Sequence, residues 1–229
     1  MNSREFLFSP PHLAILASIP AVAGALSWWL RRYPRAAPSV RGTLGAMLAA
    51  NELVWYGWRY STEGWRFPEG LPLQLCDVLV WAAAAACLTR WQWSFEFAYF
   101  AGIPGAGMAA LTPDLWSPWP SYPAVYYFLA HGLVLVSVLT LVWSGAARPL
   151  PGALKRVFAA LNAFAAAVGL FNLAFGSNYM YLCRKPASAS ALDWMGPWPI
   201  YIFTGELAAA ALFALLALPF RSRPRKELP

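Results

Sequence analysis

The stretch PAVYYFLAHGLVLVSVLTLVW, residues 123–143, decides the fold class of this chain. It contains no Asp, Glu, Lys or Arg, and a helix needs about 20 mainly apolar residues to cross the hydrocarbon core of a bilayer. Of the 229 residues, 59% are hydrophobic and 12% are charged, whereas soluble domains carry about 25% charge. A soluble core of this size could not hide so much apolar surface, so we expect lipid to be the solvent.

Six further stretches have the same character, which predicts an all-α polytopic membrane protein. We expect a single domain, residues 1–229, built as a bundle of about seven transmembrane helices. The predicted helices cover residues 12–30, 40–58, 72–88, 95–111, 123–143, 154–175 and 198–220. The fourth contains Gly102, Pro104, Gly105 and Gly107, which predicts a kink or close packing through small residues.

The distribution of Lys and Arg predicts the topology. One side would hold twelve of the 17 basic residues: Arg31, Arg32, Arg35, Arg41, Arg90, Arg148, Lys155, Arg156, Arg221, Arg223, Arg225 and Lys226. The other side would hold five: Arg4, Arg59, Arg66, Arg184 and Lys185. Because cytoplasmic loops carry the excess of Lys and Arg, this split places the N-terminus outside and the C-terminus in the cytoplasm.

Composition also limits which cofactors and partners the sequence predicts. The net charge of +7 is dispersed in short stretches between apolar blocks, so it indicates cytoplasmic anchors rather than a nucleic-acid surface. Three cysteines are too few for a disulfide framework, and two histidines without ligand spacing predict neither a metal nor a haem site. We expect membrane lipids as partners and no cofactor. The sequence indicates no particular protein partner.

Polar residues inside a membrane span are costly, so each is a candidate for function. The helical rise of 1.5 Å per residue places His131 about 12 Å below the outer start of its helix, and Glu52 at a similar depth. The residues predicted to support or line an outward-opening cavity are Gln74, Asp77, Asn51, Glu52, Asn178, Tyr181, Asp193, Trp198 and Glu206. They come from several helices but share one half of the bilayer.

Cys76 and His131 have two kinds of interpretation at this stage. Cys76 is a small buried hydrophobe, a disulfide partner of Cys183, or a nucleophile near the start of a helix, where a thiolate is favoured. His131 is a hydrogen-bonded interhelical residue or the base for that thiol. In the catalytic interpretation Asp77, Glu52 or Glu206 would orient the imidazole; otherwise Glu52 and Glu206 are polar contacts between helices.

Several ordered motifs resemble one family. They are the segments Leu71–Asp77 (LPLQLCD), Gly105–Asp114 (GAGMAALTPD), Tyr127–Gly132 (YFLAHG), Asn178–Leu182 (NYMYL), Lys185–Pro186 and Asp193–Pro199 (DWMGPWP). Together they resemble the YwaF-type bacterial integral membrane proteins, over most of the chain. That family is similar to the eukaryotic transmembrane protein 164 group, viewed as phospholipid acyltransferases. More distantly it is similar to androgen-induced membrane hydrolases that use a Thr and a His.

The resemblance implies that Cys76 and His131 are the catalytic pair. It also implies that the protein resides in a cell membrane, specifically a bacterial inner membrane. The leading hypothesis is acyl transfer or ester hydrolysis on a membrane lipid. Gln74, Asn51 or N–H groups at the start of the third helix would steady the oxyanion. Arg184 and Lys185 would bind the headgroup, or are ordinary juxtamembrane charges. The alternative is a transporter or small-ligand-binding membrane protein with Glu52, Glu206 and His131 as proton or cation sites.

Overall fold

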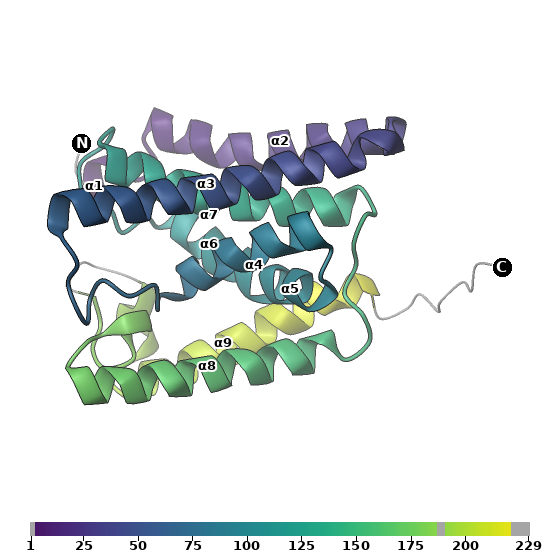
Figure 1. The fold of residues 1–229 in the computed structure, drawn as a ribbon. Helices are drawn as coiled ribbons and strands as arrows, with labels where there is room; N and C mark the ends of the chain where they lie inside the picture. The colour runs from purple at the N-terminus through teal and green to yellow at the C-terminus, as the bar shows by residue number, and fades with distance from the viewer. Residues whose placement is uncertain (1–2, 187–190, 221–229) are drawn as a thin grey trace.

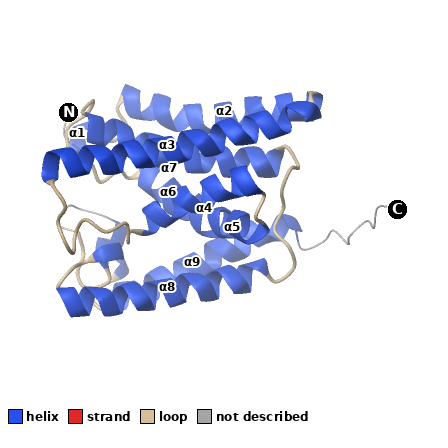
Figure 2. Ribbon diagram, viewed as in Figure 1, coloured by secondary structure: helices blue, strands red, loops and turns tan. Residues whose placement is uncertain are grey.

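The computed structural model describes residues 3–186 and 191–220, and within these ranges the chain is helical with no strand (Figure 2). This confirms the all-α prediction. The helices are α1 (Ser3–Phe6), α2 (Pro10–Arg32), α3 (Ala37–Glu63), α4 (Leu75–Thr89), α5 (Gln92–Phe97), α6 (Ile103–Leu111), α7 (Tyr122–Trp143), α8 (Ala153–Phe175) and α9 (Ile200–Ala217). The shorter turns are η1 (Pro34–Ala36), η2 (Ala98–Gly102), η3 (Tyr179–Tyr181), η4 (Ala191–Met195) and η5 (Leu218–Phe220). The basic residues Arg221, Arg223, Arg225 and Lys226 lie outside the described part.

Four helical segments of the described chain are long and apolar enough to cross a membrane by themselves: α2, α7, α8 and the segment Ile200–Phe220. They establish a multi-pass membrane protein. The other three predicted spans correspond to α3, α4 and the continuous segment α5–η2–α6. In that last segment, Pro104 cannot donate a backbone hydrogen bond, and the chain passes through a turn of π-helix at η2 just before it. A Cβ added at Gly102 or Gly105 would lie within 3.4 Å of Val134 or Leu79, so the segment shows the predicted close packing through small residues.

The helices form three groups in space (Figure 1). α2, α3 and α7 lie along one side, and α8 and α9 lie along the other. The segments α4, α5 and α6 lie between them. The alanine-rich α4 is buried along much of one face and packs closely on α3. The central position of α4 brings its start close to α7, where the polar residues of the outer half gather.

The start of α4 differs from the sequence prediction. Pro72 was expected to open this helix, but α4 begins at Leu75. Gln74 is the N-cap in an extended conformation, and Asp77 accepts a hydrogen bond from the Gln74 backbone N–H at 3.2 Å. This reciprocal capping box fixes the first turn and makes Cys76 its second residue. With 15 residues, α4 is about 22 Å long, shorter than a hydrocarbon core of about 30 Å, so this helix alone does not cross it.

Exposed aromatic side chains mark both ends of the bundle, as expected at the two headgroup boundaries of a membrane. At the predicted outer end these are Tyr60, Trp65, Phe67, Trp116, Trp194 and Trp198. At the predicted cytoplasmic end they are Trp28, Trp29, Tyr33, Trp91, Trp93 and Trp143. The two belts support a bundle that spans the bilayer, and which end faces the cytoplasm remains a prediction from charge.

Candidate functional site

The side chains of Cys76 and His131 are in direct contact. The Cys76 Sγ lies 3.1 Å from His131 Nε2. Cys76 belongs to the first turn of α4, and His131 lies in the middle of α7, with only 7% of its surface exposed. The two helices run in the same direction from the predicted outer end, so both residues lie in the half of the bundle nearer to that end. The structure thus brings together the two residues of the catalytic hypothesis.

A backbone carbonyl sets the tautomer of His131. Nδ1 lies 2.7 Å from the Tyr127 carbonyl oxygen, which can only accept, so Nδ1 carries the proton. Nε2 is then a lone-pair acceptor that faces the Cys76 thiol. The predicted carboxylates do not orient the ring. The contact between Tyr127 and His131 could have been predicted from the sequence, because the two residues are four apart on one helix.

Each of the three carboxyl groups expected to orient His131 has another partner. Glu52 is fully buried and accepts a hydrogen bond from the Tyr126 hydroxyl at 2.8 Å. Asp77 accepts from the Gln74 backbone. Glu206 accepts from the Asn162 side chain of α8 at 2.9 Å, and it does not line the cavity that contains Cys76. The proton or cation set proposed for a transporter, with Glu52, Glu206 and His131, is therefore not assembled in one place.

Cys76 and His131 line a cavity of about 490 Å³. Part of its lining consists of small and apolar residues of α4, α6 and α7: Leu79, Val80, Ala106, Ala109, Ala130 and Val134. Polar and aromatic residues also line it: Trp55, Arg59, Glu63, Glu69, Asp114, Trp116, Tyr126, Tyr127, Tyr179 and Tyr181. A cavity with both apolar and polar lining suits a molecule that has both a hydrocarbon part and a headgroup.

Residues 177–184, called the strap below, close one side of the cavity. Asn172 of α8 anchors the strap: its Nδ2 donates to the Tyr179 carbonyl at 2.9 Å, and its Oδ1 accepts from the Tyr179 N–H at 2.9 Å and the Ser177 hydroxyl at 2.8 Å. Gln74 Oε1 accepts from the Met180 N–H at 3.0 Å. Gln74 therefore caps α4 and holds the strap through its Oε1, and it also lines the cavity with Cys76. Its predicted role toward an oxyanion would use the Nε2 donor and stays a prediction.

The strap contains two successive left-handed residues, Met180 at φ 56° and Tyr181 at φ 54°. This conformation is costly for residues other than glycine and persists only where the surroundings enforce it. The Tyr181 hydroxyl donates to Asp114 Oδ2 at 3.3 Å, and the Tyr201 hydroxyl donates to the Tyr181 carbonyl. Burial and the adjacent Asp114 carboxylate raise the pKa of Tyr181 to about 12, so its phenol stays protonated and able to donate.

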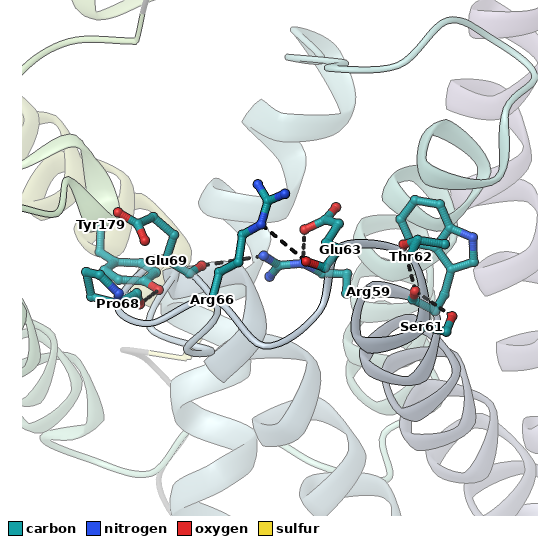
Figure 3. A network of polar contacts seen from close by, with 9 residues as sticks. Arg59, Ser61, Thr62, Glu63, Arg66, Pro68, Glu69 and Tyr179 are labelled. Atoms are coloured by element: carbon teal, nitrogen blue, oxygen red, sulfur yellow. Dashed lines mark hydrogen bonds and ion pairs between the residues drawn. The ribbon is translucent and has the colours of Figure 1, made fainter.

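Figure 3 shows the polar network at the mouth of the cavity, between the end of α3 and the strap. Arg59 Nε lies 3.3 Å from Glu63 Oε2, and Arg59 Nη2 donates to the Glu69 carbonyl at 3.5 Å. The Tyr179 hydroxyl donates to the Pro68 carbonyl at 2.7 Å. Arg59 was predicted only as one of the basic residues of the outer side. It is the arginine that lines the cavity, because α3 extends five residues beyond its predicted end.

The remaining predicted site residues lie around the cavity rather than in it. Asn178 binds backbone groups of Cys183 and Arg184, and Arg184 lines a separate hollow of about 220 Å³ with Gln74 and Tyr179. The residues of the last connection also bind each other: Lys185 pairs with Asp193 at 3.8 Å, and Trp198 Nε1 donates to the Leu182 carbonyl at 3.0 Å. The Asn51 Nδ2 is buried without a hydrogen-bond partner in the described chain.

The cysteine alternatives can also be compared with the structure. Cys76, Cys87 and Cys183 are all free thiols. Cys76 contacts His131 and is not bonded to Cys183. Cys87 is buried near the other end of α4, where it packs in the core.

These observations define a class: a multi-pass α-helical membrane protein with a cysteine–histidine pair in a recess at one end of the bundle. A comparison with protein families shows in addition to which family the chain belongs. The TMEM164 family matches residues 7–217, which is nearly the whole chain, and the chain belongs to this family. No curated protein and no solved structure matches it.

Proposed function

We propose that the chain is an acyltransferase or ester hydrolase acting on membrane lipids, with Cys76 as nucleophile and His131 as general base. The observation that carries this proposal is the 3.1 Å contact between Cys76 Sγ and His131 Nε2. A base must lie within hydrogen-bond reach of the proton that it takes, and this pair meets that condition. The recess beside the pair is large enough for part of a lipid and opens toward a headgroup boundary.

The first half-reaction forms a thioester. His131 Nε2 takes the thiol proton as Cys76 Sγ attacks the acyl carbonyl carbon of the donor lipid. The C–O ester bond then breaks, and the imidazolium returns the proton to the leaving alcohol. The oxyanion of the donor ester would be stabilised by backbone N–H groups in the first turn of α4, with the Gln74 Nε2 donor beside them, because the strap engages only the Gln74 Oε1.

The second half-reaction releases the acyl group. An acceptor hydroxyl, from another lipid or from water, gives its proton to His131 as its oxygen attacks the thioester carbonyl. The C–S bond breaks, the new ester or acid forms, and the imidazolium reprotonates the thiolate. A lipid acceptor makes the reaction a transfer, and water makes it a hydrolysis. We also propose that the protein resides in the cell membrane of a bacterium, with its cavity facing outward.

The test compares purified protein with its Cys76→Ala and His131→Ala variants on phospholipid with a labelled acyl chain. Cys183→Ala is the matched control, because Cys183 is a free thiol close to the same end of the molecule. We expect His131→Ala to lose at least about a hundredfold in rate, since general base catalysis contributes that much. Cys76→Ala should lose at least as much, because it removes the nucleophile that forms the thioester. Intact mass should show an acyl adduct that depends on Cys76. Full activity in either variant would refute the mechanism.

The alternative, a transporter or ligand-binding protein, makes a different prediction for the same variants. Uptake or ligand binding should tolerate Cys76→Ala and should respond to Glu52→Gln. Acyl transfer should show the reverse dependence on Cys76. Measuring labelled-lipid turnover and ligand binding on the same preparations separates the two functions.

A further inference from the structure

A second cavity, of about 410 Å³, lies at the predicted cytoplasmic end of the bundle. It lies where the start of α3, the end of α4 and the connection between α7 and α8 meet. It shares no lining residue with the cavity that contains Cys76, and the two lie at opposite ends of α4. A ligand in this cavity would therefore not contact Cys76 or His131.

Two arginines line this second cavity, Arg41 of α3 and Arg90 at the end of α4. Arg41 is half-buried, and its Nε donates to the Cys87 carbonyl at 3.1 Å, which anchors the guanidinium against the last turn of α4. Its Nη groups have no hydrogen-bond partner among the residues that the structure describes. Arg90 is exposed and adopts a left-handed φ of 60°, a position at a helix end where glycine is usual.

The positive charge of this cavity is not balanced by carboxylates. Its lining contains no Asp or Glu. The acidic residue of this end within the described chain is Glu96, and its two oxygens accept hydrogen bonds from Arg156, Gln92 and the Leu150 N–H. Glu96 is therefore committed elsewhere. The first turn of α3 adds a wall through Ala37 and Pro38, and the N-terminal end of a helix is itself favourable for an anion.

We propose that this cavity binds the phosphate of an anionic lipid headgroup from the leaflet at this end. Guanidinium groups suit phosphate because they present paired N–H donors, and basic pockets between transmembrane helices bind anionic headgroups. The apolar side chains of Phe95 and Leu141 in the same lining suit the part of the lipid next to the phosphate. A choline headgroup would find no acidic partner for its ammonium, so a net anionic lipid is favoured over a zwitterionic one.

The test is native mass spectrometry and thermal-shift titration of the full chain in detergent. The probes are dioleoyl phosphatidylglycerol, dioleoyl phosphatidylcholine and inorganic phosphate. We expect one tightly bound phosphatidylglycerol and weak binding of the other two. The Arg41→Gln, Arg90→Gln double variant should bind phosphatidylglycerol about thirtyfold more weakly, which corresponds to about 2 kcal/mol.

The matched control is the Arg32→Gln, Arg35→Gln double variant, which removes two exposed arginines of the same end that do not line the cavity. It should bind within twofold of the unmodified protein. Equal weakening in both double variants would show diffuse attraction and overturn the proposal. Inorganic phosphate bound as tightly as the lipid would also overturn it. Arg90→Gln alone breaks no hydrogen bond of the described chain. It should weaken the binding of phosphatidylglycerol about fivefold, which tests the site even if the double variant unfolds.

Discussion

Replacing Asn172 with alanine should release the strap that closes the Cys76 cavity. The Asn172 side chain is 1% exposed and makes three hydrogen bonds to the strap residues Ser177 and Tyr179. Each such bond contributes about 1 kcal/mol, so the loss of three lowers the free energy of local opening by about 3 kcal/mol. That difference corresponds to about a hundredfold in the equilibrium between closed and open strap. The left-handed conformations of Met180 and Tyr181 favour opening further once the anchor is gone.

The measurement is amide hydrogen exchange by mass spectrometry on peptides that cover residues 176–186. Exchange that reports local opening should quicken about a hundredfold in Asn172→Ala. Asn162→Ala is the matched control: it is the same substitution on the same helix, but Asn162 contacts Glu206 and the Phe158 carbonyl instead of the strap. Equal exchange in Asn172→Ala and the unmodified protein would refute the anchoring role.

Two further predictions concern the buried charge and the shape of the first cavity. Arg156→Ala should lower the thermal midpoint more than Glu96→Ala. Removing Arg156 leaves the carboxylate of Glu96, which is 1% exposed, without its cation. Removing Glu96 leaves Arg156, which is 46% exposed and can be solvated. Equal midpoints in a detergent melt would contradict this. Ala106→Phe should place a ring in the cavity and so slow the alkylation of Cys76 by N-ethylmaleimide at least tenfold. Peptide mass spectrometry measures the rate of this alkylation. Gly107→Ala, whose added methyl meets open space, should leave the rate unchanged.

The helical segments could be predicted from the sequence because lipid imposes a simple requirement. A backbone inside hydrocarbon must satisfy its own hydrogen bonds, so long apolar runs form helices. The predicted limits of the helix at 123–143 and of the helix at 154–175 differ from α7 and α8 by one residue at most. The start of α4 was missed by three residues because its position depends on a side-chain cap, the Gln74–Asp77 box, which hydropathy does not register.

Depth along a helix follows from counting residues, but the direction in which a side chain points does not. Cys76 and His131 were predicted at the same end of the bundle, and packing of α4 against α7 brought their side chains within 3.1 Å. Glu206 was predicted at a similar depth, yet α9 packs on α8 and turns it toward Asn162. The rotation of each helix depends on how its whole surface fits its neighbours, which no single segment encodes.

The sequence by itself therefore determined that this chain is a multi-pass helical bundle, and it indicated which end holds the polar residues. Only the tertiary structure decided which of those residues form the site. The Tyr127 carbonyl, rather than a carboxylate, holds His131, and Arg59, rather than Arg184, lines the cavity mouth. The physical reason is that apolar burial is summed along one segment, whereas a hydrogen bond requires two segments to meet with the right rotation and depth.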